Sequence, residues 1–482
     1  MTEPRNALRI FEEISCIPRC SGNEEEVARW FERWAAAHGF CCRRDGAGNR
    51  RIQVPPSAGG ERAPTVVLQA HLDMVCEKTP ESTHDFRRDP LRLVREGDWL
   101  RAEGTTLGAD NGAGLALAAA LAERPDLARP PLELLLTVDE ETGLTGAKRL
   151  EPGFVTGRLL INLDSETEGV FTIGCAGGVE SRIELALERG EPPAGLVPRR
   201  LVVGGLQGGH SGIDIHRPRA NAIRILARLL GEIGDLPDTA VFAVSGGSRR
   251  NAIARDAWAD IACRPERERE LGGRIAQAAE RLRGLYPGET ALFCELRESP
   301  SPPAGLGAFS PPCLRRVLDL LLALPHGPLL PDERFEGLVH SSANLAVVET
   351  GADSLTVVTS ERSLSREGLE ETVARIRAVA ALARARVRLE SEYPPWTPDP
   401  GSPLLALCRR VYARRFGAEP RVRAIHAGLE CALIGHLYPG MDMISVGPTT
   451  ENAHSPHERL HVPSLARLEE FLVALLAELA RS

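Results

Sequence analysis

The sequence contains very few lysines and no long apolar run, and each absence excludes a class of protein. Only two of the 58 basic residues are lysines, and the formal net charge is −8. A basic face for nucleic acid is therefore not expected. No stretch of about 18 uncharged apolar residues is present, so we expect no membrane span. The first residues also lack the basic and then apolar pattern of a secretory signal.

The cysteines follow no metal-binding or redox spacing. There are 11 of them, an odd number, and none is arranged as CxxC. This excludes a zinc ribbon and predicts free thiols in a reducing compartment. Together with the missing signal and membrane span, it predicts a soluble cytoplasmic protein.

Apolar runs alternate with helical patterns in the first third of the chain. Residues 63–75, 131–140 and 158–166 read as strands, and residues 111–123 read as a helix. Strands that alternate with helices predict an α/β fold with a doubly wound, largely parallel sheet. Another helix is expected before Gly39, with Ser21 or Asn23 as its N-cap.

The composition and the strand pattern of the sequence change in the middle of the chain. With 482 residues the chain exceeds one ordinary core, so we expect two domains, or three. Residues 188–200 and 390–403 are rich in Pro and read as linkers. Between them the strands alternate more regularly, as in an α+β domain. The prediction is one domain made of residues 1–185 and 395–482, with residues 186–394 inserted.

Acidic residues and histidines follow the predicted strands. They occur in QAHLDMV, LGADNGAG, TVDEETG, INLDSETEG and ENAHSPHERL, and the candidates are His71, Asp73, Asp110, Glu140, Glu141, Asp164 and His454. The carboxyl ends of parallel strands form one edge of a sheet, where such folds place their sites. Three consecutive acids need solvent or a cation, because like charges repel more strongly as water is excluded.

The residue types favour a metal site. Imidazoles and carboxylates without thiolates suit zinc, manganese or cobalt. His71 and Asp73 are two apart on a strand and point the same way, so Asp73 can hold the His71 ring. Glu140 and Glu141 are adjacent, so they cannot both point at one ion from regular structure. One is expected to bind metal and the other to act as a general base.

Each motif also has an ordinary explanation when taken alone. A His-x-Asp pair is most often a plain strand end, and three acids in a row are common in solvated loops. GADNGAG resembles a loose nucleotide loop, but it follows no clean strand and carries an Asp where a phosphate would lie. Four such motifs at the ends of predicted strands favour the metal site.

Together these motifs resemble the dinuclear zinc peptidases related to carboxypeptidase G and peptidase T, in the branch of the aminoacyl-histidine dipeptidases. IPRCSGNEEEVARW near the start fits as well, although Cys20 stands where that branch is expected to have Pro. The resemblance spans nearly the whole chain. It implies a zinc-peptidase-like catalytic domain with a mixed sheet and an inserted lid domain.

The resemblance also implies two divalent ions, most often Zn²⁺, with Co²⁺ or Mn²⁺ as alternatives. One ion would be held by His71, Asp110 and Asp164, and the second by Asp110, Glu141 and His454, with Asp110 bridging. Asp73 would orient His71, and Glu140 would be the general base. A cis peptide is expected between Asp110 and Asn111.

The insert carries further candidates by the same resemblance. His210 would reach the scissile carbonyl, and Asn251 and Arg362 would bind the C-terminal carboxylate of the substrate, which suits the fork of an arginine. Glu430, near His426, would pair with the substrate's free amine. Each of these last two roles has an alternative: Arg362 could form a surface salt bridge, and Glu430 could have a structural role. Relatives of this class often pair through the lid, which makes a homodimer one alternative. The other is a monomer, because the insert is long enough to fold over its own active site.

The implied activity is metal-dependent hydrolysis of dipeptides with broad specificity, including Xaa-His dipeptides such as carnosine. A small peptide is then the binding partner. The rival functions are a tripeptidase or an N-acyl amino acid deacylase of the same superfamily, and a metal-binding scaffold without catalysis.

Overall fold

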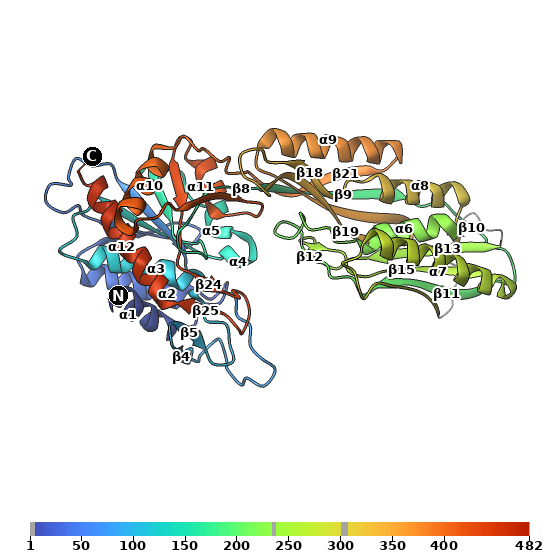
Figure 1. Ribbon diagram of the computed structural model, residues 1–482, viewed down its shortest axis with the longest axis horizontal. Helices are drawn as coiled ribbons and strands as arrows, with labels where there is room; N and C mark the ends of the chain where they lie inside the picture. Colours follow the sequence, from blue (N-terminus) through green and yellow to red (C-terminus); the bar gives the residue numbers. More distant parts are fainter. Residues whose placement is uncertain (1–4, 234–237, 300–306, 482) are drawn as a thin grey trace. The chain divides into compact units, whose positions relative to one another are not determined.

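The computed structural model describes residues 5–233, 238–299 and 307–481, and the chain divides into two compact units (Figure 1). Unit 1 contains the chain up to Cys175, Trp396–Ala424 and the segment from Leu429 onward, and unit 2 contains Ala176–Pro395 and Ile425–Gly428. The first boundary falls ten residues before the expected one. The reason is that β9 (Gly177–Ala186) pairs with β20 (Ser354–Ser363) and β21 (Arg386–Tyr393) of unit 2.

Unit 1 is built on an eight-stranded mixed sheet. Its order is β1 (Cys41–Arg44), β2 (Arg50–Val54), β6 (Leu132–Thr137), β3 (Val66–His71), β7 (Leu159–Asn162), β23 (Asp442–Ser445), β8 (Val170–Cys175) and β22 (Arg421–Ile425). The pairs among β6, β3, β7 and β23 are parallel, whereas β1, β2 and β8 pair antiparallel. The prediction of a doubly wound mixed sheet is confirmed.

The central strands are apolar because both of their faces are covered. All six residues of β3 and of β6 are buried, as expected for parallel strands between helices. In the register of the sheet, His71 lies opposite Thr137, and Gln69 lies opposite Asn162. The segments that follow β3, β6 and β7 therefore leave the sheet at the same edge.

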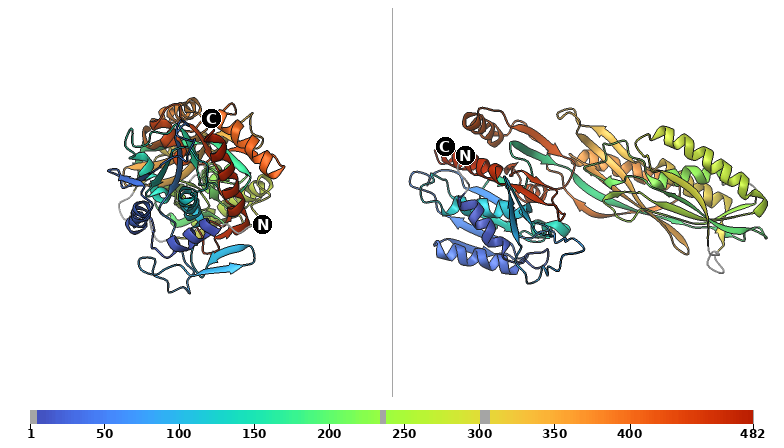
Figure 2. Two further views of the ribbon diagram at one scale, coloured as in Figure 1. Left: turned by 90° about the vertical axis from the view of Figure 1, so that its left-hand side faces the viewer. Right: turned by 60° about the horizontal axis from the view of Figure 1, so that its bottom comes forward.

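Helices cover this sheet. They are α1 (Arg5–Ser15), α2 (Glu25–Ala37), α3 (Ala109–Glu123), the short α4 (Glu140–Gly143) and α5 (Thr145–Lys148), α10 (Pro403–Phe416), α11 (Glu430–Leu437) and α12 (Val462–Leu479). Almost every residue of α3 is buried, and α3 contacts β3, α1 and α12. Small Ala and Gly side chains allow this close approach. The two views of Figure 2 show α1 and α2 (dark blue) and α12 (red) in unit 1.

The predicted N-cap of α2 is wrong. Glu24 occupies the N-cap position, and no side chain caps the helix there. The Ser21 hydroxyl donates instead to Asp73 Oδ2 at 2.8 Å. The expected C-terminal stop is confirmed, because α2 ends at Ala37 and Gly39 has a φ of 72°.

A small four-stranded sheet in unit 1 holds the C-terminal motif. Its order is β24 (Thr450–Glu451), β25 (Arg459–His461), β5 (Trp99–Ala102) and β4 (Leu93–Glu96). β25 pairs antiparallel with β5, with Leu460 opposite Leu100, so the turn that carries His454 is anchored to a strand that lies close to Asp110 in the sequence.

Unit 2 contains a nine-stranded sheet in which the recorded pairs are antiparallel. Besides β9, β20 and β21 it contains β16 (Phe293–Glu298), β11 (Val197–Gly204), β15 (Ala257–Cys263), β13 (Thr239–Gly246), β19 (Val339–Thr350) and β18 (Gly327–Pro331). The helices α6 (Ala222–Ile233), α7 (Glu268–Leu285), α8 (Pro311–Ala323) and α9 (Arg366–Leu382) pack against it as a layer, and η1 (Pro265–Arg267) precedes α7 (Figure 1). Leu, Ile and Ala of α6 fill the core beneath.

Two short strand pairs complete unit 2. β10 (Arg189–Gly190) pairs with β17 (Ala308–Phe309), and β12 (Gly209–His210) pairs with β14 (Ala252–Ile253). The prediction of a linker over 188–200 is wrong, because this segment contains β10 and the start of β11. The other predicted linker, 390–403, begins inside β21, and the division between the two units falls within it, after Pro395.

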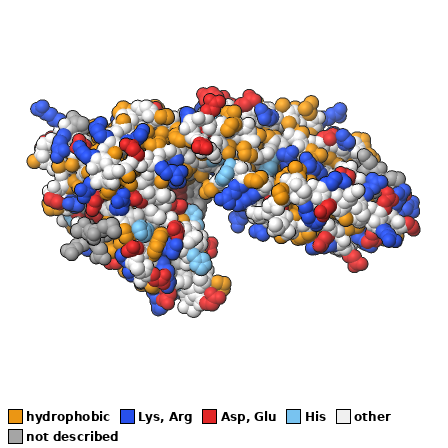
Figure 3. All heavy atoms as spheres, viewed as in Figure 1, with side chains coloured by type: hydrophobic (Ala, Val, Ile, Leu, Met, Phe, Trp, Pro, Cys, Tyr) orange, Lys and Arg blue, Asp and Glu red, His pale blue; other side chains and the backbone are white. Residues whose placement is uncertain are grey.

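Cys20 and Cys76 form a disulfide, so the prediction of free thiols is wrong for this pair. An isolated bridge between Cys20 and Met74 aligns the two segments beside it. No helix within the described ranges is long and apolar enough to cross a membrane. Figure 3 shows acidic and basic side chains interspersed over the visible face of each unit.

Candidate active site

The first group of predicted ligands gathers at the edge of the unit 1 sheet. His71 ends β3, Asp110 lies in the first turn of α3, and Asp164 follows β7. His71 Nε2 lies 3.0 Å from Asp110 Oδ1 and 3.4 Å from Asp164 Oδ1. Each of the three residues offers one ligand atom within 4.8 Å of the others.

A second group shares Asp110 with the first. His454 Nε2 lies 3.1 Å from Asp110 Oδ2 and 3.1 Å from Glu141 Oε2. Asp110 therefore turns one oxygen toward each histidine, which is the arrangement that a bridging carboxylate requires. The peptide bond between Asp110 and Asn111 is cis, as the resemblance implied. His454 has a φ of 63°, which is uncommon outside glycine and is often found at functional sites.

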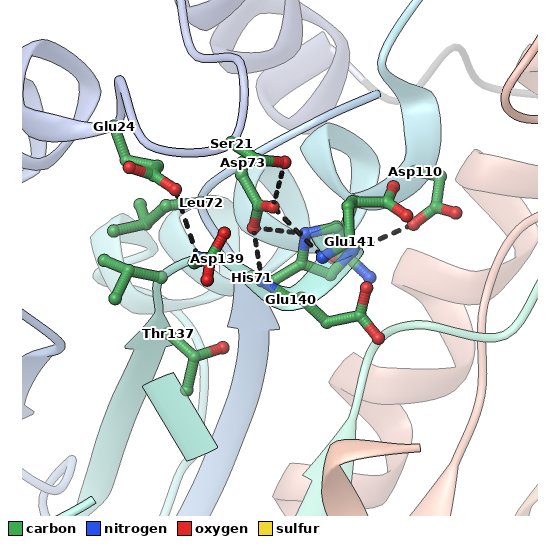
Figure 4. A network of polar contacts seen from close by, with 12 residues as sticks. Ser21, Glu24, His71, Leu72, Asp73, Asp110, Thr137, Asp139, Glu140 and Glu141 are labelled. Carbon is green, nitrogen blue, oxygen red and sulfur yellow. Dashed lines mark hydrogen bonds and ion pairs between the residues drawn. The ribbon is translucent and has the colours of Figure 1, made fainter. Parts of the chain in front are cut away.

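Asp73 connects His71 to the acidic turn. Its Oδ1 lies 3.2 Å from His71 Nδ1 and accepts a hydrogen bond from the Glu140 amide at 3.0 Å, and its Oδ2 accepts one from the Glu141 amide at 3.1 Å. Figure 4 shows the Asp73 carboxylate between the His71 ring, Ser21 and these amides. Burial raises the pKa of Asp73, but His71 and the amides outweigh it and lower the pKa to about 2. A charged Asp73 fixes the His71 ring with Nε2 toward Asp110 and Asp164.

Glu140 is a carboxylate whose surroundings favour its protonated form. Burial raises its pKa well above the usual value; His71 opposes this rise, and the charges of Asp164, Glu430 and Glu141 add to it. Glu140 and Glu141 each bring a carboxylate oxygen within 4.8 Å of a ring nitrogen of His71. Glu140 therefore lies beside both ligand groups.

These side chains fit two divalent ions. Glu141 Oε1 is buried and has no hydrogen-bond partner among the described residues, which is costly for a carboxylate unless a cation binds it. The separations of 3.0 to 3.4 Å between histidine nitrogens and carboxylate oxygens are close to the roughly 3.4 Å expected for two ligands on one tetrahedral ion at about 2.1 Å. A donor set of nitrogen and oxygen suits zinc and its neighbours in the periodic table.

His210 of unit 2 is held as a neutral hydrogen-bond donor. Its Nδ1 accepts hydrogen bonds from the amides of Gly212 at 3.2 Å and Ile213 at 3.1 Å, so the ring proton is on Nε2. Burial and the nearby Arg362 charge lower the pKa of His210 to about 4. Such a ring can donate to a carbonyl oxygen over a wide pH range.

The structure brings His210 and Arg362 together and places Asn251 nearby. A Cβ on Gly212 would lie 3.2 Å from His210 Cε1 and 3.3 Å from Arg362 Nε, so both side chains flank this glycine. Arg362 is only 9% exposed and donates to Tyr393 Oη at 2.8 Å, which excludes the surface salt bridge considered above. Its Nε is buried without a partner among the described residues. Asn251 is exposed and adjoins β14, which pairs with the strand of His210.

Glu430 is placed differently from its predicted role. Its side chain is 0% exposed, and its Oε2 accepts hydrogen bonds from Gln69 at 2.5 Å and Thr137 at 2.7 Å. Burial raises its pKa to about 7. A substrate amine cannot reach a carboxylate enclosed in this way unless the neighbours move, so the geometry favours the structural alternative.

Three residues near the site carried no functional prediction. Ser21 donates to Asp73, and Glu24 Oε1 accepts hydrogen bonds from the amides of Gly22 at 2.8 Å and Asp139 at 3.1 Å. Glu458 binds backbone amides next to Asp110. The signal for Glu458 was its place in ENAHSPHERL, four residues after His454. Ser21 and Glu24 were not predicted as site residues because their segment also fits the start of a helix.

Comparisons with known proteins agree with the motifs. The chain is 38% identical over 477 residues to the cytosol non-specific dipeptidase of Escherichia coli, a match that covers 99% of this chain and 98% of the relative. The crystal structure of aminoacylhistidine dipeptidase from Vibrio alginolyticus matches with a TM-score of 0.87 and 38% identity, over 98% of this chain and 96% of that one. The resemblance predicted from the motifs is confirmed.

More distant structures share the fold. Aminopeptidase PepT from Bacillus cereus matches with a TM-score of 0.59 and 16% identity, over 99% of this chain and 98% of that one. The model of peptidase family M20/M25/M40 matches residues 67–478, which include every candidate ligand. This chain therefore belongs to peptidase family M20/M25/M40.

Proposed function

We propose that this chain is a dinuclear metallodipeptidase that hydrolyses dipeptides of broad sequence, Xaa-His dipeptides such as carnosine included. The observation that carries the proposal is the Asp110 carboxylate, which turns one oxygen to His71 and the other to His454. The names of the two relatives at 38% identity, a non-specific dipeptidase and an aminoacylhistidine dipeptidase, support the same substrate class.

The proposed ligand sets are those of the two groups. His71, Asp110 and Asp164 hold one ion, and Asp110, Glu141 and His454 hold the other. Zn²⁺ is the first choice, with Co²⁺ or Mn²⁺ as alternatives. When bound, the ions supply Lewis-acid polarisation of the peptide carbonyl and lower the pKa of an attacking water.

Glu140 is the proposed general base. Its carboxylate takes a proton from the attacking water and then delivers that proton to the nitrogen of the leaving amine. Its raised pKa supports the first transfer, because a carboxylate with a raised pKa holds a proton more firmly than an ordinary glutamate does, and the leaving amine then takes that proton. Asp73 keeps the His71 ring oriented and, through its hydrogen bonds with the amides of Glu140 and Glu141, fixes the turn that carries the base.

Unit 2 is proposed to act as the lid domain and to supply substrate contacts. His210 donates Nε2–H to the carbonyl oxygen as negative charge develops there. Arg362, with an unpartnered buried Nε, and Asn251 bind the carboxylate that ends a dipeptide. Self-association through unit 2 and a cytoplasmic location, the latter suggested by the name of the E. coli relative, belong to the same proposal. Light scattering on the purified protein tests the dimer.

The test of the function is Glu140→Gln, compared with wild type and with Glu103→Gln as an exposed control in the same unit. The expected result for Glu140→Gln is a fall in kcat of about 10²- to 10⁴-fold on a dipeptide, with two ions still bound per chain. The control should keep wild-type turnover. Near-normal turnover of Glu140→Gln would show that Glu140 is not the general base.

A substrate panel separates the rival functions. Carnosine, other dipeptides, a tripeptide and an N-acetylated amino acid are offered to the wild-type protein. Cleavage of the acylated substrate alone would identify a deacylase, and cleavage of the tripeptide alone would identify a tripeptidase. Metal binding without any hydrolysis would identify a scaffold.

A further inference from the structure

A buried carboxylate outside the two ligand groups collects four consecutive backbone amides. Glu458 is only 2% exposed. Its Oε2 accepts hydrogen bonds from the amides of Leu107 at 2.7 Å and Gly108 at 2.8 Å, and its Oε1 accepts from those of Ala109 at 2.8 Å and Asp110 at 3.2 Å. The last of these amides belongs to the residue shared by both ligand groups.

The shape of this loop depends on Gly108. Its φ of 66° lies in the left-handed region, and this turn helps successive N–H groups to converge on one anion. A Cβ at this position would lie 2.6 Å from Arg19 Nη2 and 2.6 Å from Met74 Sδ. Loop 107–110 is thus a pre-formed cradle for a carboxylate.

The opposite charge lies beside the same loop. Arg19 is 1% exposed, and its Nη1 donates to the carbonyl oxygens of Leu72 at 3.1 Å and Asp73 at 2.9 Å. Its Nη2 donates to the carbonyl oxygen of Gly108. Burial lowers the pKa of Arg19, and the charge of Glu458 is the largest influence that opposes this. Two side chains therefore hold the loop: Glu458 accepts hydrogen bonds from its amides, and Arg19 donates one to its Gly108 carbonyl oxygen. Arg19 also binds the carbonyl oxygens that follow the strand of His71.

We propose that Glu458 is a positioning residue of the metal centre, an inference that rests on the proposed function. By binding the amides of residues 107–110, Glu458 fixes where the Asp110 carboxylate lies between the two histidines. Asp110 belongs to both groups, so a shift of this loop weakens both ion sites together. Asp73 binds the backbone amides of Glu140 and Glu141 in the same way. The loops that carry Asp110 and Glu141 are thus each tied through their amides to a buried carboxylate.

A purely structural Glu458 would stabilise the fold without affecting the affinity of the folded protein for metal. Glu458→Gln separates the two roles, because the amide has nearly the same shape but only one acceptor oxygen. Two of the four amides then face an NH₂ group instead of an acceptor. Glu451→Gln is the matched control, since Glu451 lies in the same segment, is partly exposed and pairs with Arg459.

The measurement is Zn²⁺ affinity by competition with a chelator, together with the visible absorption of the Co²⁺-loaded protein. The expected result for Glu458→Gln is about 10- to 100-fold weaker binding at both sites and an altered Co²⁺ spectrum. Glu451→Gln should match wild type. Wild-type affinity and spectrum in Glu458→Gln would overturn the proposal.

Glu458→Asp keeps the experiment decisive if Glu458→Gln does not fold. Asp keeps both acceptor oxygens, but it is one methylene shorter and cannot reach all four amides unless the loop moves. Affinity should fall in the order wild type, Glu458→Asp, Glu458→Gln. Unchanged affinity in folded Glu458→Asp would also overturn the proposal. A wild-type protein that binds fewer than two ions would instead contradict the proposed function.

Discussion

We predict that Glu361 of β20 makes the stability of unit 2 dependent on pH. Its side chain is 0% exposed, its Oε2 accepts a hydrogen bond from Ser181 Oγ at 2.8 Å, and its Oε1 has no partner among the residues described. Burial raises the pKa of Glu361 to about 7, against an ordinary value of 4.5. The folded protein therefore binds this proton more tightly than the unfolded chain does.

The sign and size of the effect follow from this difference. Below pH 4.5 the carboxyl is protonated in both states, and the raised pKa contributes its full stability. As the pH rises toward 7 the unfolded chain loses the proton first, so that contribution is lost. With about 1.4 kcal/mol for each pKa unit, the loss between pH 4.5 and pH 8 is roughly 3 kcal/mol.

Glu361→Gln removes this titration while it keeps the shape of the side chain. We expect its free energy of unfolding relative to wild type to increase by roughly 3 kcal/mol between pH 4.5 and pH 8, as measured by urea denaturation at several pH values. Glu349→Gln, an exposed carboxylate on the neighbouring strand β19, should follow the wild-type curve. Parallel pH profiles for Glu361→Gln and wild type would refute the reasoning.

Two further predictions concern substrate binding and the disulfide. Arg362→Met should raise KM for dipeptides about 10- to 100-fold but leave KM for amidated dipeptides within about twofold. Arg250→Met is the exposed control. Equal changes in KM for both substrates would show that Arg362 does not bind the substrate carboxylate. Reduction of the Cys20–Cys76 disulfide, which spans 56 positions, should lower the free energy of unfolding by about 4 kcal/mol. Urea titrations with and without reductant measure this difference. If the two unfolding curves coincide, the disulfide does not stabilise the protein.

The side chains proposed as metal ligands were predictable because their signal is local. A run of apolar residues that ends in acids identifies both the strand and the edge where it ends, as at His71 and at Glu141. The parallel pairing of β3 with β6 and β7 then brings these ends together. The resemblance supplied what spacing alone could not, which is the sharing of Asp110 between two groups.

Other features depend on partners that no local pattern reveals. Ser21 has the residue type and position of a helix cap, yet its hydroxyl binds Asp73, 52 positions away. β9 alternates as a strand of either unit would, so only its pairing with β20 and β21 decides where it belongs. Likewise, nothing in the neighbourhood of Glu430 or Cys76 shows that the first is enclosed and the second crosslinked.

The division of unit 1 between the two ends of the chain sets the order in which the centre is completed during synthesis. His454 emerges 290 positions after Asp164, which at about 5 to 20 residues per second is a delay of roughly 15 to 60 seconds on the ribosome. During that time unit 2 is made, while loop 107–110 still lacks Glu458. A nascent chain thus lacks the proposed ligand His454 throughout the synthesis of unit 2, and its proposed metal centre cannot be complete at the ribosome before Glu458 has been added.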